Sequence, residues 1–447
     1  MRRHHLLYLA FFFPPSRSSG VYRALGTVKA FHDAGWKVTV VTTTHRFFKE
    51  EIGSTDDSLL ELIPDGVGVV RVPFTFRSEL PKDLREMGWF RGNFPLLWVG
   101  LRKRLRRVIA ALDVIRGRSP DSYRMDDRYL SWIEPVVSSA KDIARESPFD
   151  HVLATGNPYS AFEAARVIGA LQDVPFSIDY RDPWAFDMRG VAPLSPATFA
   201  AEERIIAEAH GCIHVNEANA QAYRERYRVG ADKQWVVING YDDDSIPPLR
   251  GDYDGGPIHF GMLGTVTDLW PLPAVFEAWH RVRPQLPERS TLRLGGHLGF
   301  FQWSEDNILS SLPDEESAFI YEGPIPKAKV ADYYSRLHVV VTPLWGGPRA
   351  TAGKIPEVAV LGVPIVCIQN ENGGGRSFLR DHPLTFGVDA DADQIVGAML
   401  AAADLAKTIT RRKRESVREE WRHYERQTEM QQLVKVVSSA SREGATV

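Results

Sequence analysis

The beginning of the chain shows a strand–helix–strand pattern that restricts the protein to one class of fold. Residues 6–12 are uninterruptedly apolar, as is typical of a parallel strand covered on both faces. Residues 20–34 follow with apolar side chains at helical spacing and end at Gly35, and residues 37–43 form a second strand rich in valine and threonine. This order predicts a βαβ unit and therefore a parallel, doubly wound α/β sheet.

The same alternation continues along most of the chain and is interrupted once. Residues 245–257 are rich in Pro, Gly and Asp, have no apolar period and are interpreted as a linker. We therefore expect two similar α/β domains, at residues 1–245 and 258–405, followed by a charged helical tail at 406–447. In open α/β sheets ligands bind beyond the carboxyl ends of the strands, so a cleft between the two domains is the expected site.

Charge, cysteine content and missing motifs exclude several classes of protein. The 447 residues include 54 Lys and Arg against 57 Asp and Glu, and this net charge of -3 argues against a general nucleic-acid-binding surface. The two cysteines, Cys212 and Cys367, can form neither a disulfide framework nor a cysteine zinc site, which favours the cytoplasm. The sequence has no H-E-x-x-H, Walker A or C-x-x-C motif, and its apolar start lacks a signal-peptide cleavage site. We expect no bound metal and no cofactor.

Two segments of the first half carry candidate site residues. Residues 13–20 (FPPSRSSG) lie between the first strand and its helix, where Ser19 and Gly20 could bring backbone N–H groups to an anion. The alternative is a plain capping turn. Residues 179–184 (DYRDPW) follow a buried strand, so Arg181 can hold a phosphate and Asp182 can act as a base or hold a sugar hydroxyl. The alternative there is an Arg–Asp pair that only shapes the turn.

Two further segments of the second half are candidates for phosphate and ribose binding. Residues 349–357 (RATAGKIPE) open a helix, with Lys354 expected in its first turn and Glu357 on the same face. A phosphate would balance Lys354 at the positive helix end, and Glu357 could accept hydrogen bonds from ribose hydroxyls; the alternative is an ordinary surface pair. Gly264 and Thr265 follow a strand and either bring backbone amides to a diphosphate or form a ligand-free turn.

Two other segments are notable for their composition. Residues 89–118 combine eight basic residues and one acidic residue with interleaved aromatic side chains, which indicates peripheral contact with the inner membrane surface. The alternative is a helix packed on the first domain with a solvated arginine face. Residues 373–375 are three consecutive glycines and predict a loop, either a mobile one over the cleft or a plain connection.

Taken together, these segments resemble the GT-B glycosyltransferases, specifically the retaining glycosyltransferase family 4 (group 1). The resemblance is carried by LLYLAFFFPPSRSSGVYRALGTVKAFHDAGWKVTVVTTT, FDHVLATGNPYSAFEAARVIGALQDVPFSIDYRDPWAF, WVVINGYDDD and VVVTPLW with GKIPEVAVLGVPIVC. It spans nearly the whole chain and is therefore more specific than any single motif.

The resemblance implies two Rossmann-like domains facing a cleft and a C-terminal helix that crosses back to the first domain. It places the nucleotide-sugar donor mainly on the C-terminal domain and the acceptor on the N-terminal one. Lys354 matches the family's phosphate-binding lysine, Glu357 its ribose-binding glutamate and Gly20 the loop glycine near the diphosphate. Arg349 stands where the family has the first glutamate of a Glu-x7-Glu pattern. Arg181 and Asp182 stand where related members carry a histidine.

The resemblance therefore implies a retaining glycosyltransferase of carbohydrate biosynthesis that uses a nucleotide-diphosphate sugar as co-substrate. The acceptor is expected to be a glycan, a lipid-linked carrier or a small molecule, and no nucleic acid is expected as a partner. Two alternatives remain open at this point: a GT-B sugar-nucleotide epimerase, which needs no acceptor, and a non-catalytic nucleotide-sugar-binding or membrane scaffold protein.

Overall fold

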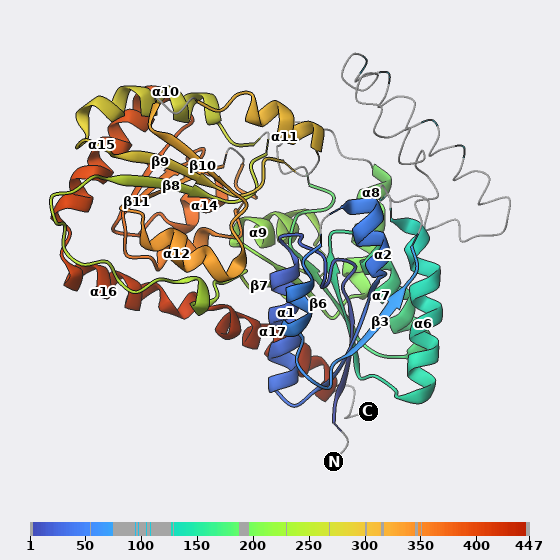
Figure 1. Cartoon of the computed structure of the whole chain (residues 1–447). Coiled ribbons are helices and arrows are strands. Elements are labelled where there is room, and N and C mark those ends of the chain that lie inside the picture. The colour runs from blue at the N-terminus through green and yellow to red at the C-terminus, as the bar shows by residue number, and fades with distance from the viewer. Residues whose placement is uncertain are drawn as a thin grey trace. The chain divides into compact units, whose positions relative to one another are not determined.

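The computed structural model describes residues 3–443 with gaps. The gaps are residue 54, residues 75–128 apart from single positions, residues 187–195 and a few shorter places at 229, 268, 300–301, 314–316, 345–346 and 350. The described chain forms two compact units (Figure 1). The first contains residues 3–186, 196–237 and 430–443, and the second contains residues 238–429.

The first unit is built on a sheet of seven parallel strands. Their order across the sheet is β3-β2-β1-β4-β5-β6-β7. The strands are β1 (His5–Leu9), β2 (Lys37–Thr43), β3 (Gly68–Val72), β4 (His151–Gly156), β5 (Phe176–Tyr180), β6 (Gly211–His214) and β7 (Gln234–Val236). The helices are α1 (Val21–Asp33), α2 (His45–Phe47), α6 (Ile133–Glu146), α7 (Ser160–Gln172), α8 (Pro196–Glu208), α9 (Glu217–Arg226) and α17 (Arg426–Glu443).

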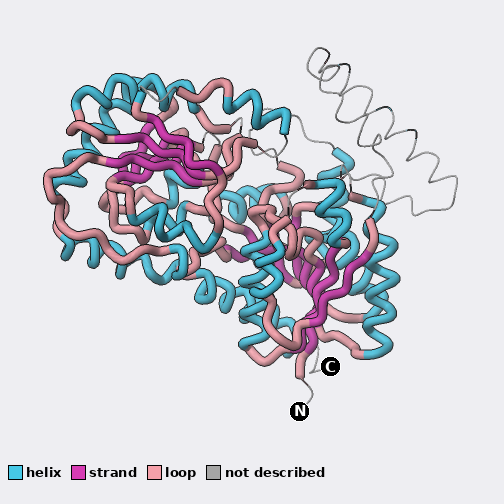
Figure 2. Tube along the Cα trace, in the orientation of Figure 1, coloured by secondary structure: helices cyan, strands magenta, loops and turns pink. Residues whose placement is uncertain are grey.

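The first strand explains why its sequence is apolar without alternation. All five residues of β1 are buried, with Leu7 and Leu9 in the core on one face of the sheet and Leu6 and Tyr8 in the core on the other. The following helix ends as its sequence predicts, because Gly35 adopts a left-handed φ of 82°. Helices therefore cover both faces of the strands, as Figure 2 shows.

The second unit repeats this plan with six parallel strands. Their order is β10-β9-β8-β11-β12-β13. The strands are β8 (His259–Leu263), β9 (Thr291–Gly295), β10 (Phe319–Gly323), β11 (Val339–Pro343), β12 (Ile365–Ile368) and β13 (Thr385–Val388). The helices are α10 (Leu272–Val282), α11 (Gln302–Leu309), α12 (Val330–Ser335), α13 (Ile355–Ala359), α14 (Gly374–Phe378), α15 (Ala392–Thr408) and α16 (Arg411–Trp421). The expected pair of parallel α/β domains is confirmed.

The points where the chain passes between the units differ from the expected ones at 245 and 406. The chain enters the second unit at Ile238, and the linker-like residues 245–257 belong to that unit. Helix α16 also belongs to it, because Val417 and Trp421 lie in its core. The chain returns to the first unit at Met430, where α17 packs into the core beside α1.

Two of the segments singled out by composition have different outcomes. The glycines at 373–375 are not a mobile loop: they cap and begin helix α14, and Gly373 and Gly375 are buried against Gln369. The basic segment 89–118 lies outside the described residues except at single positions. Among the helices that the structure describes, none combines the length and apolar character required to cross a membrane.

Candidate functional site

The predicted site residues fall into two groups, one in each unit. In both groups they lie beyond the carboxyl ends of parallel strands, where ligands bind in sheets of this kind. The first unit contributes Ser19, Gly20, Arg181 and Asp182, from the loops after β1 and β5. The second contributes Gly264, Thr265, Arg349, Lys354 and Glu357, from the loops after β8 and β11 and from α13.

In the first unit, Arg181 lies against the N-terminal end of α1. A Cβ atom built on Gly20, the residue before this helix, would lie 1.0 Å from Nη1 of Arg181. The guanidinium is held by carbonyl oxygens: Nε donates to Gly156 at 2.6 Å and Nη2 to Asn157 at 2.8 Å. Because these partners are uncharged, Arg181 adds a positive charge to the positive end of the helix, an arrangement that favours an anion.

The buried Arg–Asp pair of this unit is not the one that the sequence suggested. Arg23 of α1 binds Asp179 in bidentate fashion, with Nε 2.8 Å from Oδ2 and Nη2 2.7 Å from Oδ1, and both side chains are fully buried. The remaining Nη1 of Arg23 donates to the carbonyl of Val237 at 2.9 Å. Sequence reasoning missed Arg23, although an Asp at the end of a buried strand was a signal that a cation must face it.

The neighbouring Asp182 is therefore not the carboxylate that pairs with the buried Arg23. Burial raises the pKa of its carboxyl, and the charge of Arg181 opposes that rise. The backbone of the turn is fixed by Tyr159, whose hydroxyl lies 2.9 Å from the carbonyl oxygen of Pro183 and 3.2 Å from that of Asp182. A half-buried carboxyl with raised proton affinity on a fixed turn suits an acid–base role.

In the second unit, Lys354 and Glu357 meet as the spacing predicts. Lys354 occupies the N-cap position, one residue before α13, and its Nζ lies 2.9 Å from Oε1 of Glu357. The hydroxyl of Tyr334, on α12, donates to the same oxygen at 2.7 Å. Glu357 is only 5% exposed, whereas the side chain of Lys354 is 37% exposed, so the pair is not an ordinary surface pair. Both hydrogen bonds fall on Oε1 of Glu357.

A pocket lined by Lys354 and Tyr334 lies at the carboxyl ends of β8 and β11. Its walls are mostly apolar and include the indole of Trp270, while Lys354 supplies the ammonium group at its edge. Burial and the negative charge of Glu357 both raise the pKa of Tyr334, which also lines the cavity, so its hydroxyl remains a donor at neutral pH. A small apolar cavity with a few convergent polar groups is typical of a small-molecule site.

The expectation for Gly264 needs a correction. Its backbone N–H donates to the carbonyl of Gly295 at 3.0 Å, so that amide continues the parallel pairing of β8 with β9 and is not directed to a ligand. Gly264 is required by conformation, because its φ of 154° disfavours any side chain. Thr265 follows it and is half-buried, and Arg349 lies half-buried in the loop between β11 and α13.

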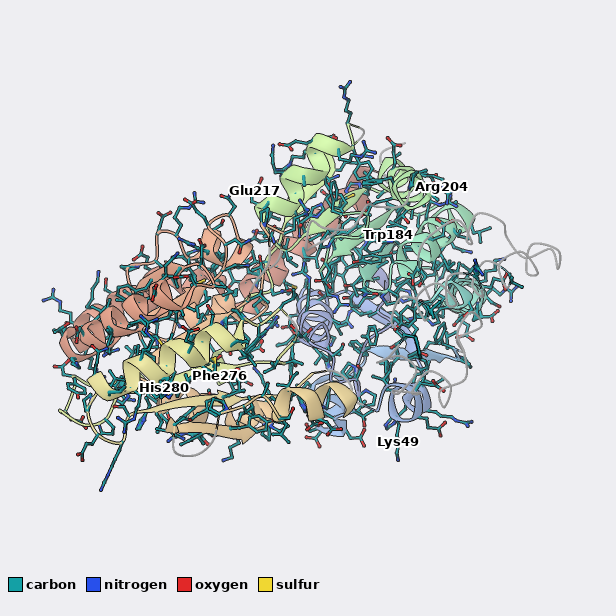
Figure 3. The ribbon with its side chains drawn as sticks, turned by 90° about the horizontal axis from the view of Figure 1, so that it is seen from above. Lys49, Trp184, Arg204, Glu217, Phe276 and His280 are labelled. Atoms are coloured by element: carbon teal, nitrogen blue, oxygen red, sulfur yellow. The ribbon has the colours of Figure 1, made fainter. Side chains whose placement is uncertain are left out.

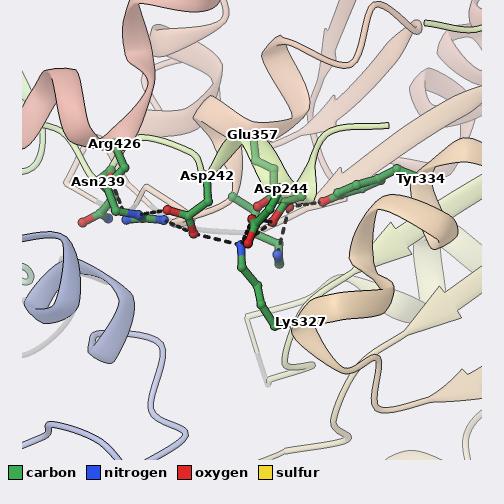
Figure 4. A network of polar contacts seen from close by, with 9 residues as sticks. Asn239, Asp242, Asp244, Lys327, Tyr334, Glu357 and Arg426 are labelled. Carbon is green, nitrogen blue, oxygen red and sulfur yellow. Dashed lines mark hydrogen bonds and ion pairs between the residues drawn. The ribbon is translucent and has the colours of Figure 1, made fainter. Parts of the chain in front are cut away.

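A polar network that sequence reasoning missed lies near Glu357 (Figure 4). Asp242 accepts from Nε of Arg426 at 2.6 Å and from Nζ of Lys327 at 2.8 Å. Lys327 also pairs with Asp244 at 3.0 Å. Asp242 stands in a run of three aspartates, and such a run in an otherwise apolar region was the signal that partner cations were needed.

Comparisons with known proteins bear on the family and the fold. Residues 20–240 match the family model for the glycosyl transferase 4-like domain. A glycosyltransferase from Rickettsia africae has the same fold, with a TM-score of 0.67, 10% identity and coverage of 98% of this chain and 99% of that one. Sucrose-phosphate synthase from Thermosynechococcus elongatus has a TM-score of 0.65 and 14% identity, with coverage of 98% of this chain and 100% of that one. Anabaena HepE in complex with UDP-glucose has a TM-score of 0.61 and 13% identity, with coverage of 97% of this chain and 99% of that one.

No curated protein sequence matches the chain. The family of residues 20–240 and the fold of both units nevertheless agree with each other and with the resemblance found in the sequence. Residues 20–240 match a glycosyl transferase 4-like domain, and both units have the GT-B fold of the glycosyltransferase structures compared above.

Proposed function

We propose that the protein transfers a sugar from a nucleotide-diphosphate donor to an acceptor hydroxyl, with retention of the anomeric configuration. The observation that carries the proposal is the Lys354–Glu357–Tyr334 arrangement beside the apolar cavity of the second unit. An ammonium group, a carboxylate and a mostly apolar pocket beside them suit the phosphate, ribose and ring parts of a nucleotide sugar. Retention is proposed from the family resemblance.

In this proposal the chemistry depends on the departing diphosphate. Lys354 neutralises charge that develops on the leaving phosphate as the bond to the sugar breaks. Its ion pair with Glu357 holds the ammonium group in place beforehand, so little reorganisation is needed during the reaction. Oε2 of Glu357 accepts hydrogen bonds from ribose hydroxyls and so selects a nucleoside carrier.

The first unit is proposed to handle the acceptor. Arg181 and the N-terminal end of α1 attract an anionic group, and Asp182 takes or shares the proton of the attacking hydroxyl. The raised pKa of Asp182 makes its carboxylate a better proton acceptor than an exposed aspartate. We propose Ser19 and Thr265 as further contacts of the phosphates, and Arg349 as a contact of the donor in place of the family glutamate.

A nucleotide-sugar panel tests the function directly. Because HepE is described in complex with UDP-glucose, UDP-sugars are the first donors to test by thermal shift and by release of nucleoside diphosphate. Lys354→Ala and Glu357→Ala should abolish donor-dependent turnover, whereas Lys329→Ala, which removes an exposed lysine on the same unit, should not. The absence of stabilisation by every donor would overturn the proposal.

The same assay separates the alternatives. An epimerase would change the donor sugar without any acceptor, and a scaffold protein would bind the donor without turnover. Product NMR then gives the configuration of the new glycosidic bond, and an inverted product would refute retention. Contact of residues 89–118 with a membrane and a location in the cytoplasm remain predictions, and co-sedimentation with anionic liposomes, with and without this segment, tests the first of them.

A further inference from the structure

The turn that carries Arg181 and Asp182 is supported from within the first unit by a buried carboxylate. Glu202, on α8, is fully buried. Its Oε1 accepts a hydrogen bond from the hydroxyl of Tyr223 at 2.7 Å, and its Oε2 accepts one from the hydroxyl of Tyr227 at 2.6 Å. The two tyrosines are four residues apart, at the end of α9 and just beyond it, and so reach the carboxylate from one face of the chain.

The Tyr223 hydroxyl joins this carboxylate to the backbone of the turn. Because its single proton is donated to Glu202, its oxygen accepts a hydrogen bond from the backbone N–H of Trp184 at 3.1 Å. The indole of Trp184 stacks on Tyr159, with ring centres 5.2 Å apart and an angle of 13° between the planes. Trp184 and Arg204, a neighbour of Glu202 on α8, are labelled in Figure 3.

We propose that Glu202 is a positioning residue, whose ionised carboxylate fixes the backbone at Trp184 through Tyr223 and thereby holds Arg181 and Asp182 in their working positions. This inference rests on the proposed function of that turn. The inference extends that function by proposing that pH controls the acceptor side of the site. Glu202 itself touches neither the donor nor the acceptor.

The surroundings of Glu202 explain why this control would operate near neutrality. Burial raises the pKa of Glu202 to about 7, although the hydroxyls of Tyr227, Tyr223 and Tyr180 favour the charged form. Among the described residues, the neutral groups whose pKa responds to Glu202 are uncharged at this pH. They are Tyr180 on β5, Cys212 on β6, Tyr223 and Tyr227 from the α9 region and Tyr159 before α7, and burial raises the pKa of each of them.

The hydrogen bonds from Glu202 through the Tyr223 hydroxyl to the backbone of Trp184 form a relay. Protonation of Glu202 would reverse part of this relay. A carboxylic acid has an O–H that donates, so Glu202 could no longer accept from both tyrosines through two ionised oxygens. One tyrosine would have to turn its own proton elsewhere, although Glu202, Tyr223 and Tyr227 are all buried. The turn would then lose support as the pH falls below about 7.

The test compares Tyr223→Phe with Tyr227→Phe in the full chain. Both remove one hydroxyl from Glu202, but only Tyr223 also holds the backbone of Trp184. Hydrogen–deuterium exchange of the peptide that contains Trp184 should become about tenfold faster in Tyr223→Phe and change about twofold or less in Tyr227→Phe. Equal exchange in the two variants would overturn the relay.

Kinetics then test what the relay does for activity. At pH 8, Tyr223→Phe and Glu202→Gln should lower kcat about tenfold with an unchanged KM for the UDP-sugar, because Lys354 and Glu357, the main groups proposed to bind the donor, lie in the second unit. The wild-type kcat should fall below pH 7, and Glu202→Gln should lack this step. If Glu202→Gln does not fold, the two tyrosine variants decide the question by themselves. The inference would be refuted if Glu202→Gln kept the pH profile of the wild type, or if the two tyrosine variants of an active enzyme had equal kcat. An inactive wild type would instead refute the proposed function.

Discussion

The guanidinium of Arg181 fills the space that a side chain at position 20 would need. A Cβ atom on Gly20 would lie 1.0 Å from Nη1 and 2.2 Å from Cζ of Arg181. The φ of Gly20 is -73°, so a left-handed backbone is not the reason for glycine here. The reason is close approach: Arg181, which follows β5, lies against the start of α1.

This contact predicts the effect of Gly20→Ala. The clash falls on the far end of a flexible arginine, so the fold should survive while Arg181 is displaced, and kcat should fall about tenfold or more. Gly397→Ala is a suitable control, because a Cβ atom there meets nothing within 4 Å and the position lies inside α15. That control should keep its activity and gain about 0.5 to 1 kcal/mol of stability. Full activity of Gly20→Ala would exclude Arg181 from the mechanism.

A second prediction concerns the shared oxygen of Glu357. Tyr334→Phe removes one of the two groups that hold Oε1, so Oε2 should no longer be fixed toward the ribose. Hydrogen bonds to charged groups contribute about 1.5 to 3 kcal/mol, so affinity for UDP should fall about tenfold or more. Discrimination between UDP and 2′-deoxy-UDP should fall with it.

The neighbouring tyrosine provides the control for that measurement. Tyr333→Phe, on the same helix, removes a hydroxyl that bonds the carbonyl of Met262 and not Glu357. Calorimetric titration of UDP should therefore separate the two variants. If both lose affinity equally, the effect comes from the packing of α12 and not from the orientation of Glu357.

The comparison of sequence and structure shows what a pattern of residues can and cannot predict. The apolar run of β1 and the glycine after α1 are local signals, and each led to the correct element. The Lys354–Glu357 pair was also local, because three residues along a helix place two side chains on one face. Tyr334, the third member, comes from another helix 23 residues away, and no spacing rule points to it.

Buried polar partners are the part that the sequence hides most completely. Arg23 and Asp179 are 156 residues apart, and only the packing of α1 on the sheet brings them together. The partner of a backbone amide is equally hidden: the N–H of Gly264 bonds the carbonyl of Gly295 because β9 lies beside β8 in the sheet. Composition shows neither relationship, since each depends on which elements become neighbours in the sheet.

A third prediction uses the network around Asp242. Burial raises the pKa of this carboxyl, but the charges and hydrogen bonds of Arg426 and Lys327 outweigh burial and lower it to about 2. A carboxylate with a lowered pKa stabilises the fold above its ordinary pKa and loses that contribution as the pH falls toward 2. The unfolding free energy at pH 7 should therefore fall by about 2 kcal/mol in Asp242→Asn.

The pH dependence of denaturant unfolding checks this prediction. The difference between wild type and Asp242→Asn should shrink steadily between about pH 4 and pH 2. Asp244→Asn is the matched control, because Asp244 pairs with the same lysine but its side chain is 73% exposed. That variant should lose less than about 1 kcal/mol. A difference for Asp242→Asn that persists at pH 2 would assign its effect to packing.

The last prediction concerns the buried pair of Arg23 and Asp179. Removing one partner leaves the other charge buried and unpaired, so Arg23→Met and Asp179→Leu should each destabilise the first unit by about 3 to 5 kcal/mol. The double variant leaves no unpaired charge and should cost much less than the sum of the two. Arg23→Lys should not restore stability, because an ammonium group cannot bind Asp179 through two parallel bonds and reach Val237 as well. A double-mutant cycle by urea unfolding measures this coupling, and strictly additive losses would show that the two charges do not depend on each other.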